Sequence, residues 1–153
     1  MANGKQHAKA ADGLIVAGAI AGFTLLPWQL AALATAGLVI GKYANPDVRD
    51  QEDVRNHAEH LISRHFGCLF GWLWTFYWWP LAWLIPHRHW ASHLPGVATI
   101  IAWLYLFGPL LALVALMLPD YLFVAAVVVC WTLPGWFLQD CVHLALDGWK
   151  VRW

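Results

Sequence analysis

The chain has 153 residues, of which 61% are hydrophobic and 12% are charged, and its formal net charge is zero. Soluble domains carry about 25% charged residues, so this composition excludes an ordinary soluble domain and indicates an integral membrane protein. A net charge of zero gives no indication of a nucleic-acid partner. We therefore expect a single membrane domain over residues 1–153, with the lipid bilayer as its principal partner.

The first apolar segment, residues 13–41, contains no charged side chain. It is longer than the ~20 residues that one membrane span needs. Pro27, Trp28 and Gln29 interrupt it, and this tripeptide combines a turn former with an aromatic residue typical of the membrane interface. We predict two short spans, at about 10–26 and 28–43, joined by a tight turn.

A polar juxtamembrane stretch is expected at 44–65, and the apolar segment that follows, 66–86, contains five tryptophans and Pro80. Tryptophan is enriched at the membrane–water interface because its ring is apolar while its N–H group remains hydrated. We therefore predict that residues 66–86 form an interfacial or re-entrant segment rather than a full span.

Two further spans are predicted at about 94–118 and 121–147, with a turn at Pro119 and Asp120. The fold class that follows is all-α: an integral membrane bundle of four transmembrane helices, arranged as two hairpins. In this arrangement every lysine and arginine lies on one side, because the turns near Pro27 and Pro119 contain none. The positive-inside rule then predicts a multi-pass protein with both termini in the cytoplasm.

The same arrangement gathers histidines and aspartates at the cytoplasmic end of the bundle. Asp140, His143 and Asp147 have the spacing i, i+3, i+7, which places them on one stripe of a helix. Acids at the C-terminal end of a membrane helix are unfavourable unless they are paired or bind a metal. The predicted metal ligands are His7, Asp47, His87, His93, Asp140 and His143.

Mixed imidazole and carboxylate ligands suit zinc, with manganese or iron(II) as alternatives. Asp147 is expected to orient a ligand or to act as a base. Arg88, beside His87, has a planar guanidinium that can bind a phosphate or carboxylate. Asp147 and Arg88 are therefore the candidate catalytic residues.

Three motifs carry a resemblance to a known family: NPD at 45–47, WWPLAWLIPHRHWASH at 78–93 and QDCVHLALD at 139–147. Together they look like the motifs of an uncharacterised family of small membrane proteins predicted to bind metal. That family is similar to the membrane-bound metal-dependent hydrolases, which share a Pro-Asp, a His-Arg…Ser-His and an Asp…His…Asp pattern. The resemblance implies a metal-activated water that attacks an ester, with a phosphoester as the first choice.

The resemblance extends from His7 to Asp147, and the motifs follow in the family's order. The chain departs from the family pattern at two positions. Arg49 stands where the family has the second acid of Pro-Asp-x-Asp, and Ala8 follows His7 where the family has an acid.

The leading hypothesis is thus a metal-dependent hydrolase that acts on an amphiphilic phosphoester at the cytoplasmic membrane face. A second is a non-catalytic accessory subunit, in a homo-oligomer or a larger membrane complex, that holds a structural metal. A third is a histidine-rich di-iron lipid oxygenase, although the repeated HxxHH clusters expected of that class are missing from the sequence.

Overall fold

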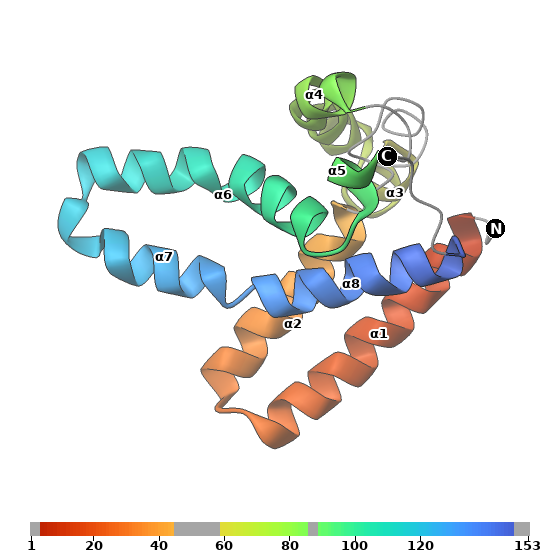
Figure 1. Cartoon of the computed structure of the whole chain (residues 1–153), viewed down its shortest axis with the longest axis horizontal. Helices are drawn as coiled ribbons and strands as arrows, with labels where there is room; N and C mark the ends of the chain where they lie inside the picture. Colours follow the sequence, from red (N-terminus) through yellow and green to blue (C-terminus); the bar gives the residue numbers. More distant parts are fainter. Residues whose placement is uncertain (1–3, 45–58, 86–88, 149–153) are drawn as a thin grey trace.

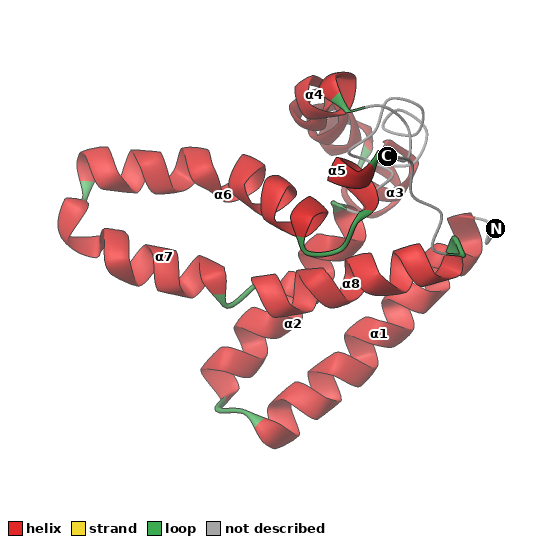
Figure 2. Ribbon diagram, in the orientation of Figure 1, coloured by secondary structure: helices red, strands yellow, loops and turns green. Residues whose placement is uncertain are grey.

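The computed structural model describes residues 4–44, 59–85 and 89–148. These residues are helical and contain no β-strand, which confirms the all-α prediction (Figure 2). The elements are α1 (Gly4–Leu25), α2 (Trp28–Tyr43), α3 (Glu59–Phe66), α4 (Cys68–Leu84), α5 (Trp90–His93), α6 (Val97–Met117), the 3₁₀ turn η3 (Pro119–Tyr121), α7 (Leu122–Cys130) and α8 (Leu133–Leu146).

Three helical stretches within the described residues are long and apolar enough to cross a membrane, namely Gln6–Leu25, Val97–Met117 and Pro119–Leu146. These stretches indicate a multi-pass membrane protein. The second helix predicted from the sequence, α2, has 16 residues and is shorter than these three.

Helices α1 and α2 lie side by side and run in opposite directions (Figure 1). Pro27 precedes α2, and its ring fixes the backbone φ at −53° where the chain turns. Small residues allow the two helices to approach closely, since a Cβ on Gly22 would lie 3.6 Å from the Cβ of Ala31. The bounds of α2 coincide with the predicted helix at 28–43, whereas α1 begins six residues before the predicted start at 10.

The helix predicted at 121–147 is interrupted, because a turn at Trp131 and Thr132 separates α7 from α8 (Figure 1). Pro134 explains the interruption, since a proline has no N–H and its ring clashes with the carbonyl four residues earlier. The Val129 carbonyl at the end of α7 accepts hydrogen bonds from Thr132 Oγ1 at 2.6 Å and from Trp103 Nε1 at 3.1 Å. The Val129 carbonyl is therefore satisfied where α7 ends.

Glycines bring α8 into close contact with α2. A Cβ on Gly37 would lie 1.9 Å from the Thr132 carbonyl oxygen, and a Cβ on Gly135 would lie 2.0 Å from the Ala34 carbonyl oxygen. Close backbone approach of this kind is typical of helix pairs in membranes. As a result, α8 crosses both α2 and α1 and carries its C-terminal end to the start of α1 (Figure 1).

Helix α4 is continuous through Pro80 and packs against the core with its buried Trp78. The Tyr77 hydroxyl donates to the Tyr105 carbonyl at 2.6 Å, and the Tyr105 hydroxyl donates to the Tyr77 carbonyl at 2.7 Å. Trp74 Nε1 donates to the Tyr43 carbonyl at 2.9 Å. These bonds fix α4 to α6 and to the end of α2.

Candidate metal centre

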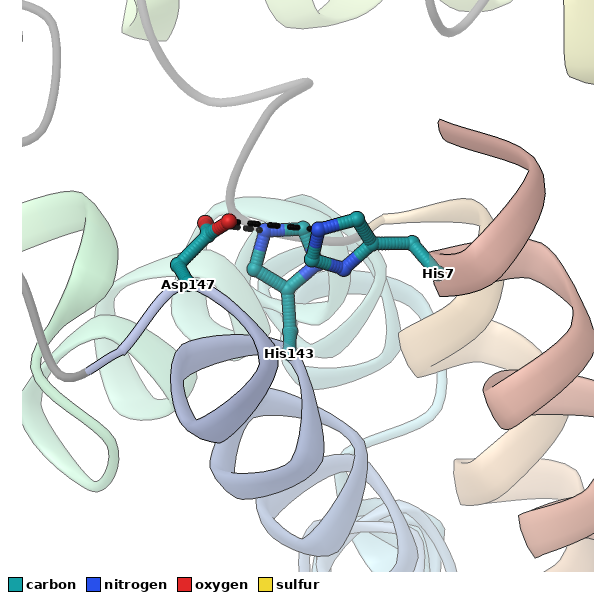
Figure 3. A group of neighbouring side chains, drawn as sticks. All are labelled: His7, His143 and Asp147. Carbon is teal, nitrogen blue, oxygen red and sulfur yellow. Dashed lines mark hydrogen bonds and ion pairs between the residues drawn. The ribbon is translucent and has the colours of Figure 1, made fainter. Parts of the chain in front are cut away.

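His7, His143 and Asp147 come together where the first helix begins and the last one ends (Figure 3). His7 lies in the second turn of α1, His143 lies in the last turn of α8, and Asp147 is the residue that caps α8. The side chains of all three are at most 9% exposed. Two elements that are far apart in sequence thus bury two imidazoles and a carboxylate together.

The Asp147 carboxylate is shared by the two imidazoles. His7 Nε2 lies 3.2 Å from Asp147 Oδ1, and His143 Nε2 lies 3.5 Å from Asp147 Oδ2. The rings of His7 and His143 face each other, with centroids 4.2 Å apart and an angle of 31° between their planes. Each imidazole therefore presents the same nitrogen, Nε2, to one carboxylate group.

The three residues are of types that can bind a divalent metal ion such as zinc. Zinc bonds to histidine nitrogen and carboxylate oxygen are about 2.0–2.1 Å long, which places neighbouring ligand atoms roughly 3.4 Å apart in a tetrahedron. One ligand atom from each of the three residues lies within 4.8 Å of the others. The donor types therefore suit a divalent ion, and the contacts as they stand also suit a buried hydrogen-bonded network.

The end of α8 holds the Asp147 side chain in place. The Asp147 N–H donates to the His143 carbonyl at 3.2 Å, and the Gly148 N–H donates to the Ala145 carbonyl at 3.1 Å. Gly148 has a φ of +71°, the left-handed conformation that commonly ends a helix at glycine. A carboxylate at a helix C-terminus is electrostatically unfavourable, so Asp147 needs the two imidazoles, or a cation, beside it.

His93 lies next to this group on the short helix α5. Its ring centroid is 6.2 Å from that of His143, and the side chain is 1% exposed. Ser92 Oγ donates to the His89 carbonyl at 3.0 Å and also lies 2.8 Å from His93 Nδ1. The serine has only one proton, so His93 Nδ1 is the donor in the second bond when that proton goes to the His89 carbonyl, and His93 Nε2 then carries the lone pair.

Asp140 lies one turn deeper in α8 and is fully buried. Thr99 Oγ1, on α6, donates to Asp140 Oδ2 at 2.7 Å. The hydroxyl of Thr99 also accepts a bond from the Gly96 N–H at 3.4 Å. Asp140 is therefore hydrogen-bonded to α6 and does not belong to the group of ligand atoms within 4.8 Å.

No protein-family model, no curated protein and no solved structure matches this chain. The functional interpretation therefore depends on the donor atoms and their geometry.

The structure brings together some of the predicted site residues and separates others. The predicted ligands His7 and His143 lie close together, and Asp147, predicted to orient a ligand or to act as a base, lies with them. The ring of His93 lies 6.2 Å from that of His143, and Asp140 lies about one helical turn before His143 on α8, where it is bonded to Thr99. Asp47, His87 and Arg88 lie outside the described residues.

Two polar residues with contacts at the site, Ser92 and Thr99, were not among the candidates selected from the sequence. Thr99 is an ordinary residue in apolar surroundings, without a local pattern that marks a function. Ser92 belongs to the Ser-His pair of the motif at 78–93 that carries the resemblance, and that motif is the signal that could have drawn attention to it. The partner of Thr99 is 41 residues away, so only the tertiary structure reveals it.

Proposed function

We propose that this chain is a multi-pass membrane protein that binds a divalent metal ion and hydrolyses an ester in an amphiphilic molecule at the cytoplasmic membrane face. Zinc is the first choice of metal, and manganese or iron(II) are the alternatives. The observation that carries the proposal is the buried group of His7, His143 and Asp147. When bound, the metal ion would supply a Lewis acid and lower the pKa of a water molecule.

The number and type of donors support a catalytic role. Catalytic zinc sites commonly use three protein ligands and leave one position for water or substrate, whereas structural sites use four. Two imidazoles from His7 and His143 and a carboxylate from Asp147 make such a set. In this proposal Asp147 is a ligand, and His93, whose ring lies 6.2 Å from that of His143, becomes the residue that accepts a proton.

The proposed arrangement in the membrane has four spans in two hairpins. Helix α2 would be the fourth span: its 16 residues give a length of about 24 Å, short of the ~30 Å hydrocarbon core. Local thinning of the bilayer accommodates short spans at a modest energetic cost. Both termini would lie in the cytoplasm, as the distribution of lysine and arginine predicts.

Helix α4 would lie at the interface in this arrangement. Its outer face exposes aromatic side chains, with Trp72 58% exposed and Trp83 67% exposed. Trp72 stacks on Phe76 with ring centroids 5.6 Å apart. Exposed tryptophans of this kind suit the boundary between headgroups and hydrocarbon, and they support placing the metal site close to the headgroup layer.

Elemental analysis of detergent-purified protein tests the proposal. We expect a single metal ion per chain in the wild type, and its loss in His7→Ala and in His143→Ala. The control is His65→Ala, because His65 is an exposed residue of α3 whose ring packs against Tyr43. A wild-type protein that takes up no metal, even when zinc is supplied, would refute the proposal. Two irons per chain would favour a di-iron oxygenase instead.

A non-catalytic protein with a structural metal is the second candidate, and the burial of the three donors favours it. Substitution with cobalt(II) distinguishes the two candidates, since the visible spectrum of cobalt reports its coordination. If the site keeps an open position, added azide or phosphate shifts the spectrum. If the site is closed, the spectrum is unchanged and the accessory-subunit reading is preferred.

A further inference from the structure

A polar side chain, that of Gln139, is buried where α8 meets α1 and α2. Gln139 is 4% exposed, and its Nε2 donates to the Ala11 carbonyl of α1 at 3.2 Å. A carbonyl oxygen has two lone pairs, and the N–H four residues later in an α-helix uses only one of them. Gln139 therefore binds α1 without breaking a hydrogen bond of that helix.

This bond lies one helical turn from the candidate metal centre on both helices. Ala11 follows His7 by four residues on α1, and Gln139 precedes His143 by four residues on α8. Residues four apart share one face of a helix and lie about 6 Å apart along its axis. Gln139 thus meets Ala11 one turn from the place where His143 faces His7 (Figure 3), so the bond fixes the register of α1 against α8.

Gly41 of α2 makes room for the Gln139 side chain. A Cβ on Gly41 would lie 2.8 Å from Gln139 Cβ and 3.1 Å from Gln139 Cγ. Because Gln139 Cβ is attached to the backbone, a side chain at position 41 would displace α8 as well as the amide. The glycine therefore allows Gln139 to pass α2 closely and reach α1.

A salt bridge holds the same turn of α1 to a different helix. Lys42 Nζ on α2 lies 2.5 Å from Asp12 Oδ1, and the Asp12 side chain is 61% exposed. Water and salt screen exposed ion pairs, which contribute little to stability. This pair joins α1 to α2, whereas Gln139 joins α1 to the helix that carries His143.

We propose that Gln139 is a positioning residue for the candidate metal centre. It acts through α1, where it holds His7 opposite His143, and it is not one of the three candidate ligands. Groups that orient the ligands of a metal commonly change its affinity when they are removed. The effect on metal affinity rests on the proposed function, whereas the effect on the register of α1 does not.

Zinc affinity of the full-length protein in detergent, measured by competition with a chromophoric chelator, tests the proposal. Gln139→Met keeps the length of the side chain and removes the donor, and we expect it to weaken zinc binding by about tenfold. Tyr105→Phe is the matched control, because it removes a hydrogen bond to the Tyr77 carbonyl between α6 and α4. Wild-type affinity in Gln139→Met, or an equal loss in Tyr105→Phe, would overturn the proposal.

A second substitution displaces Gln139 without altering it. We expect Gly41→Ala to weaken zinc binding as well, and Gly108→Ala to leave it unchanged, since nothing lies within 4 Å of a Cβ at position 108. This pair also provides the test if Gln139→Met does not fold. In that case, a Gly41→Ala variant that binds zinc as tightly as Gly108→Ala would overturn the proposal.

Amide hydrogen exchange of the metal-free protein separates this inference from the proposed function. We expect residues 8–12 to exchange about fivefold faster in Gln139→Met than in the wild type, the factor that corresponds to one net hydrogen bond. Tyr105→Phe should leave their exchange unchanged. A wild type that binds no zinc refutes the proposed function; faster exchange in Gln139→Met then leaves the register role standing, and unchanged exchange overturns it.

Discussion

The Ser92 hydroxyl lies between two acceptors, the His89 carbonyl and the ring nitrogen Nδ1 of His93. When Ser92 Oγ donates its one proton to the His89 carbonyl, the bond to His93 Nδ1 has the imidazole as donor. Hydrogen bonds to the second ring nitrogen commonly fix the tautomer and the orientation of functional histidines. Ser92 is therefore a positioning residue, which acts through His93.

We expect Ser92→Ala to release this tautomer, so that His93 becomes a mixture of its Nδ1–H and Nε2–H forms. Long-range ¹H–¹⁵N NMR spectra of protein labelled on the histidine rings measure this directly. Ser63→Ala is the control, because the buried Ser63 hydroxyl has no hydrogen-bond partner among the described residues. An unchanged His93 spectrum in Ser92→Ala would contradict the assigned role.

The bond from Thr99 to Asp140 predicts a loss of stability when the hydroxyl is removed. Asp140 is fully buried, and a buried acceptor that loses its donor costs about 1–3 kcal/mol. We expect Thr99→Val to lower the free energy of unfolding by that amount in a denaturant titration in detergent. Thr99→Ser keeps the hydroxyl and should recover most of the loss; a serine variant as unstable as the valine variant would argue against the bond.

Residue type and topology placed His7, His143 and Asp147 among the candidate residues, and the structure brings these three side chains together. Asp140, His143 and Asp147 share one stripe of α8, so the sequence could not tell which acid lies beside the imidazoles. In the structure the two acids have different partners: Asp140 accepts a hydrogen bond from Thr99, and Asp147 contacts His7. Such a choice depends on which residue of a neighbouring helix lies opposite, and local patterns contain no information about that.

At the scale of elements, the contact between α2 and α8 depends on the absence of a side chain at Gly135. Alanine has a higher helix propensity than glycine by about 1 kcal/mol, so propensity alone would make Gly→Ala stabilising. Here the new Cβ would lie 2.0 Å from the Ala34 carbonyl oxygen, in the backbone of α2. The two effects have opposite signs, which makes the substitution informative.

We expect Gly135→Ala to destabilise the protein by about 1–3 kcal/mol, because backbone must move to admit the methyl group. Gly108→Ala is the matched control on α6, where nothing lies within 4 Å of the new Cβ, and it should be neutral or stabilising. Thermal unfolding of both variants in the same detergent provides the comparison. A Gly135→Ala variant as stable as Gly108→Ala would show that α2 and α8 pack less closely than described.

Two prolines explain where the observed helix ends agree with the predicted ones and where they differ. Pro27 lies between two apolar helices, and its turn marks the start of α2 at Trp28. Pro134 lies within an apolar run with no polar residue beside it, so the break at Trp131 and Thr132 leaves no mark in the hydropathy. Helix α1 extends back to Gly4, and contacts with α8 hold this first part of the helix. His7 contacts Asp147, and Gln139 Nε2 donates to the Ala11 carbonyl.

At the scale of the whole molecule, the proposed topology predicts which residues are accessible from each side of the membrane. Asp120 lies in the turn between α6 and α7, and Arg64 lies on α3; both are exposed. In a variant without the native cysteines, we expect Asp120→Cys to react with a membrane-impermeant maleimide on intact cells. Arg64→Cys should react only after permeabilisation, and the reverse pattern would place the termini outside.

The contact between His7 and Asp147 joins residues that are 140 positions apart. A ribosome adds about 5–20 residues per second, so His7 is synthesised and inserted well before its partner exists. The cluster therefore cannot form on a growing chain, and any cation that it binds must be acquired after synthesis of α8 is complete. Occupancy of the site would thus distinguish finished molecules from nascent ones, and a chain that stops before His143 would insert its first helices yet remain without a binding site.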